Sequence, residues 1–200
     1  MIDLYTWNTA EGHSVAIMLE AIQIPYQVHP VDMLDLKEQP AAFQTISPNK
    51  VPAITDPEGP NAEPVSLFGC APVLIYLAEK SCHFIPESPA QHYQCLQWVV
   101  WQQSDVAPTL SQVHEVVDSG DTLSLALEHQ TRLLWQALAN QLSGKRFICG
   151  EDLTIADFAL YPWVVSIKQS SIDPGALAPI ARWLEQLSDI EFMHNGLHIP

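Results

Sequence analysis

The stretch Ser47–Ile54 reads SPNKVPAI and leads directly into a short apolar run, Ala53–Asp56. A turn cluster, Pro57–Asn61 (PEGPN), separates this run from a second one, Val65–Phe68. Two short apolar runs with proline and glycine between them are typical of a β-hairpin. We therefore expect two strands immediately after the Ser47–Ile54 stretch.

The residues before this stretch alternate strand and helix signals. Ile2–Tyr5 and Tyr26–Val31 are predicted strands, and Pro25 ends the helix between them. That helix is indicated by apolar residues spaced i, i+3, i+4, i+7 on one face, namely Val15, Met18, Leu19 and Ile22. After the hairpin, Pro72 fits the first turn of a further helix that runs through Lys80. The predicted order is βαβ, a linker, then ββα.

The second part of the chain is predicted to be entirely helical. His83–Pro89 contains two prolines and interrupts the periodicity, which indicates a domain boundary. Beyond it, helices are marked by spaced apolar residues (Leu127, Leu134, Leu138; Ile180, Trp183, Leu184, Leu187), and Thr154 with Asp157 fits a capping box. The fold class is therefore α/β plus all-α. We expect a domain over 1–82, a linker over 83–90 and an all-helical domain over 91–200.

Composition excludes several function classes. The chain of 200 residues has a net charge of −15, which disfavours nucleic acid and anionic membrane surfaces as partners. The sequence shows neither an apolar run long enough for a membrane span nor a signal-peptide profile, so we expect a cytoplasmic protein. The four cysteines, which lack a Cys-x-x-Cys pair, are expected to be free thiols, and the histidines show no metal-ligand spacing. No metal site is predicted.

The βαβ–ββα order followed by helices resembles the glutathione transferase superfamily, whose fold is a thioredoxin-like domain followed by a helical bundle. Ser47–Ile54 is similar to that family's Asn-Pro-Asn-x-Lys-Ile-Pro-Ala segment, in which the proline is cis and the preceding residue binds the cysteinyl backbone of glutathione. Lys50, Val51 and Pro52 match this segment and are expected glutathione-binding positions. Leu96–Gln102 also resembles the bacterial nu class, the disulfide-reductase-like transferases, and Gly150–Asp157 is similar to the capping segment of the family's sixth helix.

The resemblance weakens at the positions that contact glutathione. The family's Glu-Ser pair, which binds the γ-glutamyl group, is replaced here by Gly69 and Cys70. Thr9 matches the family's threonine near the thiol sulfur, but Glu11 stands where an asparagine is expected. The Ser47–Ile54 loop is one residue shorter than usual, and Ala126–Leu127 replaces a typical Arg-Tyr. These changes predict a degenerate site at which glutathione binds weakly or is absent.

Three of these residues have alternative interpretations. Cys70 is either a reactive thiol, activated by the helix N-terminus, or a small inert residue in place of serine. Thr9 either donates a hydrogen bond to a ligand sulfur, as the catalytic residue, or caps the first helix. Glu11 is either a solvated acid favoured by the helix dipole or a ligand contact.

Three functions remain open from the sequence. The first is a homodimeric enzyme of the glutathione transferase type that acts on thiols, disulfides or a small electrophile. The second is a non-catalytic binding or regulatory protein that has lost glutathione binding. The third is an enzyme for another small ligand, with Glu11 supplying the acid that Gly69 lacks. In the resembled fold the small-molecule ligand lies in the interdomain cleft.

Overall fold

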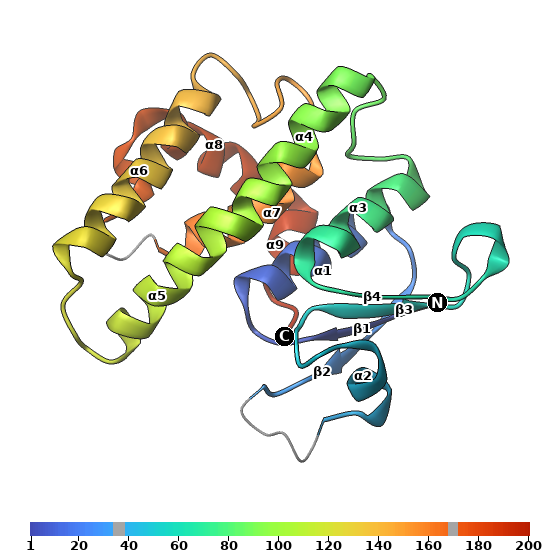
Figure 1. Ribbon diagram of the computed structural model, residues 1–200. Helices are drawn as coiled ribbons and strands as arrows, with labels where there is room; N and C mark the ends of the chain where they lie inside the picture. The colour runs from blue at the N-terminus through green and yellow to red at the C-terminus, as the bar shows by residue number, and fades with distance from the viewer. Residues whose placement is uncertain (34–38, 168–171) are drawn as a thin grey trace. The chain divides into compact units, whose positions relative to one another are not determined.

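The computed structural model describes residues 1–33, 39–167 and 172–200 (Figure 1). The chain divides into two compact units, one formed by Met1–Ile85 with Asp189–Pro200 and the other by Pro86–Ser188. The C-terminal residues thus differ from the sequence-based assignment, which placed them in the helical domain. They join the first unit because the last helix, α9 (Glu191–Gly196), packs against α1 (Ala10–Ile22).

Close packing of α9 against α1 depends on a glycine. A Cβ atom added at Gly196 would lie 2.5 Å from the backbone nitrogen of Ile17, so only glycine fits at this position. A six-residue helix is too short to show an apolar period of its own. Its association with the first unit was therefore not visible in the pattern of the sequence.

The first unit contains a four-stranded sheet in the order β2-β1-β3-β4. β1 (Ile2–Thr6) pairs in parallel with β2 (Tyr26–Pro30) and antiparallel with β3 (Ala53–Asp56), which in turn pairs antiparallel with β4 (Val65–Phe68). β3 and β4 coincide with the predicted hairpin, whose turn includes a short 3₁₀ segment at Pro60–Ala62. Together with α1 and α3 (Cys70–Ser81), this arrangement confirms the predicted thioredoxin-like fold.

The predicted linker between β2 and β3 contains a helix that the sequence analysis did not identify. This helix, α2 (Ala41–Ile46), has one fully buried side chain, Phe43, which packs with Tyr5, Val31 and Ala53. A single apolar anchor in six residues gives no amphipathic stripe. The helix is therefore held by tertiary packing rather than by a readable pattern.

The second unit is helical, as predicted. α4 (Pro89–Trp101) continues through a π-helical segment, 102–106, into α5 (Ala107–Asp118), and the unit is completed by α6 (Leu125–Leu142), α7 (Ile155–Ser166) and α8 (Ala178–Ser188). The apolar residues predicted to mark α6 and α8 are all buried. No helix in the described parts of the chain is long and apolar enough to cross a membrane.

Asp157 is the buried polar centre of the second unit. Its carboxylate accepts the N–H groups of Ile148 and Thr154, each at 3.0 Å, and the indole N–H of Trp183 at 2.9 Å. Burial raises the pKa of Asp157 to about 6, against the opposing effect of these hydrogen bonds. The reciprocal bond from the Thr154 backbone shows that the shorter aspartate side chain completes the capping interaction.

Candidate functional site

Two helix N-termini carry most of the sequence-predicted site residues, and both belong to the first unit. α1 begins after its N-cap Thr9, and α3 begins after Gly69. The first N–H groups of a helix have no intrahelical acceptor, and the helix dipole makes this end attractive to anions. Both termini can therefore stabilise a carboxylate or a thiolate.

Thr9 acts as the N-cap of α1. Its Oγ1 accepts a hydrogen bond of 3.0 Å from the N–H of Gly12, while its backbone is extended (φ −134°, ψ 154°). Gly12 leaves no space for a side chain, because a Cβ there would lie 2.4 Å from Thr6 Oγ1 and 2.5 Å from the carbonyl oxygen of Trp7. The loop before α1 is thus fixed tightly over the helix start. Capping uses Thr9 Oγ1 as an acceptor, which leaves its hydroxyl hydrogen as a donor.

Cys70 is fully buried at the start of α3. Burial raises the pKa of its thiol well above the usual range, and the negative charge of Glu11 raises it further. A hydrogen bond between the Ser14 side chain and the thiol acts in the opposite direction and is outweighed. A fully buried thiol with a raised pKa is a poor nucleophile, so the structure favours the inert interpretation of Cys70. Its contribution to a ligand would come from the main chain.

Ser14 is a contact that the sequence analysis missed. Its hydroxyl donates a hydrogen bond of 3.0 Å to the carbonyl oxygen of Ala10, and the residue is buried. Ser14 lies three residues after Glu11, on the same face of α1. The spacing of three residues was the signal present in the sequence, because it places Ser14 beside Glu11 on α1, and both side chains affect the pKa of Cys70.

The segment before β3 is connected to the start of α3. The N–H of Gly69 donates a hydrogen bond of 2.8 Å to the carbonyl oxygen of Pro52, and the Val51–Pro52 peptide bond is cis. Gly69 itself has φ 86° and ψ 147°, a conformation that residues with a side chain rarely adopt. Pro52, Gly69 and Cys70 are thereby brought together.

Lys50 lies at the edge of this arrangement. Its backbone N–H donates to Ser47 Oγ at 2.8 Å, and the Ser47 hydroxyl donates back to the Lys50 carbonyl oxygen at 2.6 Å. Asn49, inside this tight turn, has a left-handed conformation (φ 59°). The Lys50 side chain is exposed, so the turn fixes its main chain rather than its ammonium group.

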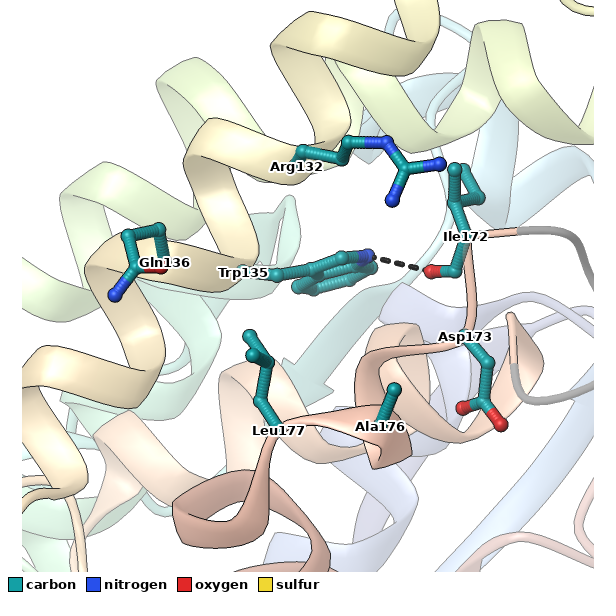
Figure 2. Close-up of a pocket in the computed structure, with 7 residues that line it drawn as sticks. All are labelled: Arg132, Trp135, Gln136, Ile172, Asp173, Ala176 and Leu177. Atoms are coloured by element: carbon teal, nitrogen blue, oxygen red, sulfur yellow. Dashed lines mark hydrogen bonds between the residues drawn. The ribbon is translucent and has the colours of Figure 1, made fainter.

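The second unit has a separate cavity of about 330 Å³ (Figure 2). Three residues of α6 line it, Arg132, Trp135 and Gln136, and the other side is lined by Ile172, Asp173, Ala176 and Leu177. The Trp135 indole N–H donates a hydrogen bond of 2.9 Å to the Ile172 carbonyl oxygen, and this bond connects the two sides of the cavity. The sequence-predicted site residues lie in the first unit and do not line this cavity.

Among the described residues, no group of three or more histidine, cysteine or acidic side chains is arranged to hold a metal ion. The four cysteines are free thiols. The N–H and hydroxyl groups at the starts of α1 and α3 are suited to stabilising an anion.

The first unit has a thioredoxin-like fold in which Pro52, after a cis peptide bond, accepts a hydrogen bond from Gly69 at the start of α3. The second unit is helical. Together these features define a protein of the glutathione transferase type. Comparison with known proteins agrees. A family model described as the glutathione S-transferase C-terminal domain matches residues 133–187. The disulfide-bond oxidoreductase YfcG of Escherichia coli K12 is 33% identical over 193 residues, which cover 94% of this chain and 90% of that protein. The chain belongs to the glutathione transferase superfamily.

Solved structures of similar proteins contain glutathione in two forms. A glutathione transferase family member from Pseudomonas fluorescens Pf-5, with two glutathione molecules bound, has a TM-score of 0.90 and 32% identity and covers 100% of this chain and 93% of its own. A glutathione transferase from Pseudomonas putida, with one glutathione disulfide bound per subunit, has a TM-score of 0.90 and 30% identity, with 100% and 91% covered. Both likenesses extend over the whole of this chain.

Proposed function

We propose that this protein catalyses thiol–disulfide exchange with glutathione at the starts of α1 and α3. The observation that carries the proposal is the hydrogen bond between the Gly69 N–H and the Pro52 carbonyl oxygen, which holds the Val51–Pro52 segment against the start of α3. The similarity to a disulfide-bond oxidoreductase and to structures with bound glutathione or glutathione disulfide supports the choice of substrate class.

In the proposed reaction, two glutathione molecules reduce one substrate disulfide. The first glutathione thiolate attacks the disulfide, forms a mixed disulfide and releases one substrate thiolate, which takes up a proton. The second glutathione thiolate attacks the glutathione sulfur of the mixed disulfide and releases the other substrate thiolate. The products are glutathione disulfide and two substrate thiols, so electrons and protons balance.

The chain's own groups have defined roles in this proposal. The Thr9 hydroxyl donates a hydrogen bond to the glutathione thiolate, and the N–H groups at the start of α1 add the favourable helix dipole. The Val51 main chain binds the cysteinyl backbone of glutathione, and the N–H groups of Cys70 and Ala71 at the start of α3 bind its γ-glutamyl carboxylate. No cysteine of the protein takes part in the exchange, consistent with the burial of Cys70.

Weak binding of glutathione is part of the proposal. Gly69 provides no carboxylate for the γ-glutamyl ammonium group, and the lost charge-assisted hydrogen bond is worth about 1.5–3 kcal/mol. Glu11 places a negative charge near the start of α3, where its effect on Cys70 is visible in the pKa. The exposed ammonium of Lys50 is one of only eight lysine and arginine charges in a chain whose net charge is −15.

We also infer a homodimer in the cytoplasm. The four free thiols fit a reducing compartment, and pairing follows from the resemblance to the family. Light scattering over micromolar concentrations should give twice the chain mass of 22.2 kDa. A single-chain mass throughout that range would contradict the inferred dimer.

Turnover of a small disulfide, such as hydroxyethyl disulfide, tests the proposed activity. The assay couples glutathione disulfide formation to glutathione reductase and NADPH oxidation. We expect wild-type turnover that saturates only at high glutathione concentration, retained activity in Thr9→Ser and a loss of at least tenfold in Thr9→Ala. If the folded protein gave turnover no faster than the uncatalysed reaction, the proposed activity would be contradicted. The result would favour the non-catalytic alternative, which is suggested by Glu11 and Gly69 at positions where the family has other residues.

A further inference from the structure

The cavity of the second unit contains two opposite charges that do not pair with each other. Arg132 lines it from α6, and Asp173 lines it from the segment that precedes α8. Figure 2 shows the guanidinium group and the carboxylate apart, on different sides of the Trp135 indole. In the described parts of the chain, no ion pair joins these two side chains. Two separated opposite charges in one cavity favour a ligand that carries both charges itself.

The guanidinium group of Arg132 is available to such a ligand. Glu128 lies four residues earlier on α6, a spacing that favours an ion pair, yet the structure does not pair these two described residues. The Arg132 side chain extends above Trp135 towards Ile172 instead (Figure 2). Arg132 is exposed, and its guanidinium makes no hydrogen bond within the described residues. A free guanidinium group binds a carboxylate through two parallel hydrogen bonds.

The carboxylate of Asp173 is held in place by the backbone beside it. Its Oδ1 atom accepts a hydrogen bond of 2.7 Å from the N–H of Gly175. This bond caps the short 3₁₀ segment at Pro174–Ala176. Its Oδ2 atom makes no hydrogen bond in the part of the chain that the structure describes. Asp173 is exposed, so this second oxygen can accept a hydrogen bond from the ammonium group of a ligand.

The apolar walls of the cavity are already formed. Trp135 and Ile172 are 3% and 2% exposed and are joined by the indole hydrogen bond of 2.9 Å. The carbonyl oxygen of Leu177 accepts the N–H groups of Ile180 and Ala181, at 2.9 and 3.0 Å, which fixes Leu177 at the start of α8. The volume of about 330 Å³ lies within the range of small-molecule sites, about 300–1,000 Å³. These walls can receive a small apolar side chain without rearrangement.

The charge of the whole chain restricts the ligand further. A net charge of −15 repels a small anion, so Arg132 alone would bind a simple carboxylate poorly. A ligand without net charge avoids this repulsion. An α-amino acid carries both of its charges on one carbon atom, whereas Arg132 and Asp173 lie apart. The two ends of a short peptide are separated charges of the required signs.

We propose that this cavity binds a short peptide with free ends and an apolar side chain. The peptide carboxylate binds Arg132, its ammonium group binds Asp173, and its apolar side chain packs against Trp135 and Leu177. All of these residues belong to the second unit. The site is therefore separate from the proposed glutathione site and does not depend on the proposed exchange reaction.

Titration with the dipeptide alanyl-leucine tests this proposal. Calorimetry measures the affinity, and the indole N–H signal of Trp135 in NMR spectra, assigned by its absence in Trp135→Phe, reports the place of binding. We expect saturable binding that shifts this signal. The amidated and the N-acetylated dipeptides each lack one charge, and each should bind at least about fivefold more weakly, a modest loss because both side chains are exposed.

Two variants assign each charge to its partner. Arg132→Gln should weaken binding of alanyl-leucine at least about fivefold, and amidation of the dipeptide should then have no further effect. Asp173→Asn keeps an oxygen that can cap Gly175, and in this variant acetylation should have no further effect. Arg146→Gln and Asp152→Asn change exposed residues of the same unit outside the cavity, so they serve as matched controls and should leave the affinity unchanged.

Three results would overturn the proposal. The first is the absence of saturable binding of alanyl-leucine at millimolar concentrations. The second is binding that leaves the Trp135 indole signal in place, because the dipeptide would then occupy another site, such as the proposed glutathione site. The third is equal affinity for the free, amidated and N-acetylated dipeptides, since the two charges would then have no role in recognition.

Discussion

The N–H of Gly69 donates a hydrogen bond of 2.8 Å to the carbonyl oxygen of Pro52. This bond connects the residue before α3 to the residue before β3, across two antiparallel strands that pair from Ala53 with Phe68 onward. It brings the Val51 main chain and the start of α3 into one site.

Restoring the family's Glu-Ser pair should strengthen glutathione binding. The double variant Gly69→Glu with Cys70→Ser supplies a carboxylate for the γ-glutamyl ammonium group, and we expect binding to tighten at least tenfold, or about 1.4 kcal/mol. Isothermal titration calorimetry measures the change. Cys70→Ser alone is the matched control and should leave the dissociation constant nearly unchanged.

Replacing Gly69 by a residue with a side chain should also lower the stability of the protein. Gly69 has φ 86°, and a side chain at this position adopts a strained backbone even though the nearest atom to an added Cβ, Cδ of Pro72, is 3.7 Å away. We expect Gly69→Ala to reduce the free energy of unfolding in urea by about 1–3 kcal/mol. Backbone strain is present with and without ligand, so it cancels from the affinity. An unchanged unfolding midpoint would show that the backbone at residue 69 relaxes freely.

Removing the charge of Glu11 should favour the thiolate form of bound glutathione. Glu11→Gln keeps the size of the side chain but removes a negative charge that raises the pKa of the nearby Cys70 thiol. We expect glutathione to bind about two- to fivefold more tightly, or about 0.4–1 kcal/mol for a partly exposed charge. The midpoint of the pH–rate profile should move to lower pH. Glu63→Gln changes an exposed acid of the same unit and should move neither quantity.

Asp157 should contribute strongly to the stability of the second unit. Asp157→Ala leaves four buried donors without their acceptor, namely the N–H groups of Ile148 and Thr154, the Thr154 hydroxyl and the indole N–H of Trp183. Because each orphaned buried donor costs about 1–3 kcal/mol, we expect the free energy of unfolding to fall by at least about 4 kcal/mol. Asp152→Ala, at an exposed position in the same loop, should change it by less than about 0.5 kcal/mol.

The ion pair of Asp56 and Lys80 should make stability depend on pH. Burial alone would raise the pKa of Asp56, but the hydrogen bonds from Lys80, Tyr76 and the Glu58 N–H outweigh it and lower the pKa. A carboxyl group with a lowered pKa in the folded state stabilises the protein above its unfolded-state pKa. This contribution is lost as the pH falls through the folded-state value.

Lys80→Met tests this dependence. At neutral pH we expect the variant to be less stable than the wild type by about 1.5–3 kcal/mol, the usual range for a hydrogen bond to a charged group. The difference should shrink as the pH is lowered below the folded-state pKa of Asp56, where the wild type loses the pair as well. Lys50→Met, at an exposed lysine, should show a small difference that does not vary with pH. If the stability difference between the wild type and Lys80→Met did not vary with pH, the effect of the substitution would come from packing of the aliphatic part of the lysine side chain.

Local patterns predicted much of the fold. The hairpin strands β3 and β4 were predictable because turn residues bound both apolar runs, and α1 because its apolar stripe repeats for two turns. α2 and α9 were not predictable, because six residues contain too few apolar positions to set a period. Their places depend on single contacts, such as Phe43 in its cluster and Gly196 against Ile17.

The site was predictable in its composition but not in its side-chain orientations. The sequence identified Glu11 and Cys70 as departures from the family pattern, and the structure places the charge of one near the thiol of the other. That Cys70 is buried against Ser14, rather than presented at the helix end, depends on how α1 packs with α3.

Calorimetric titration of the wild-type protein with reduced and oxidised glutathione tests the central claim most directly. We predict measurable binding with a dissociation constant in the high micromolar to millimolar range, because the cis-proline segment and the helix starts are present while the γ-glutamyl carboxylate partner is absent. Low-micromolar binding, unchanged in the Gly69→Glu, Cys70→Ser variant, would contradict the claim of a degenerate glutathione site. The absence of heat with either ligand up to millimolar concentration would contradict the claim that this protein uses glutathione.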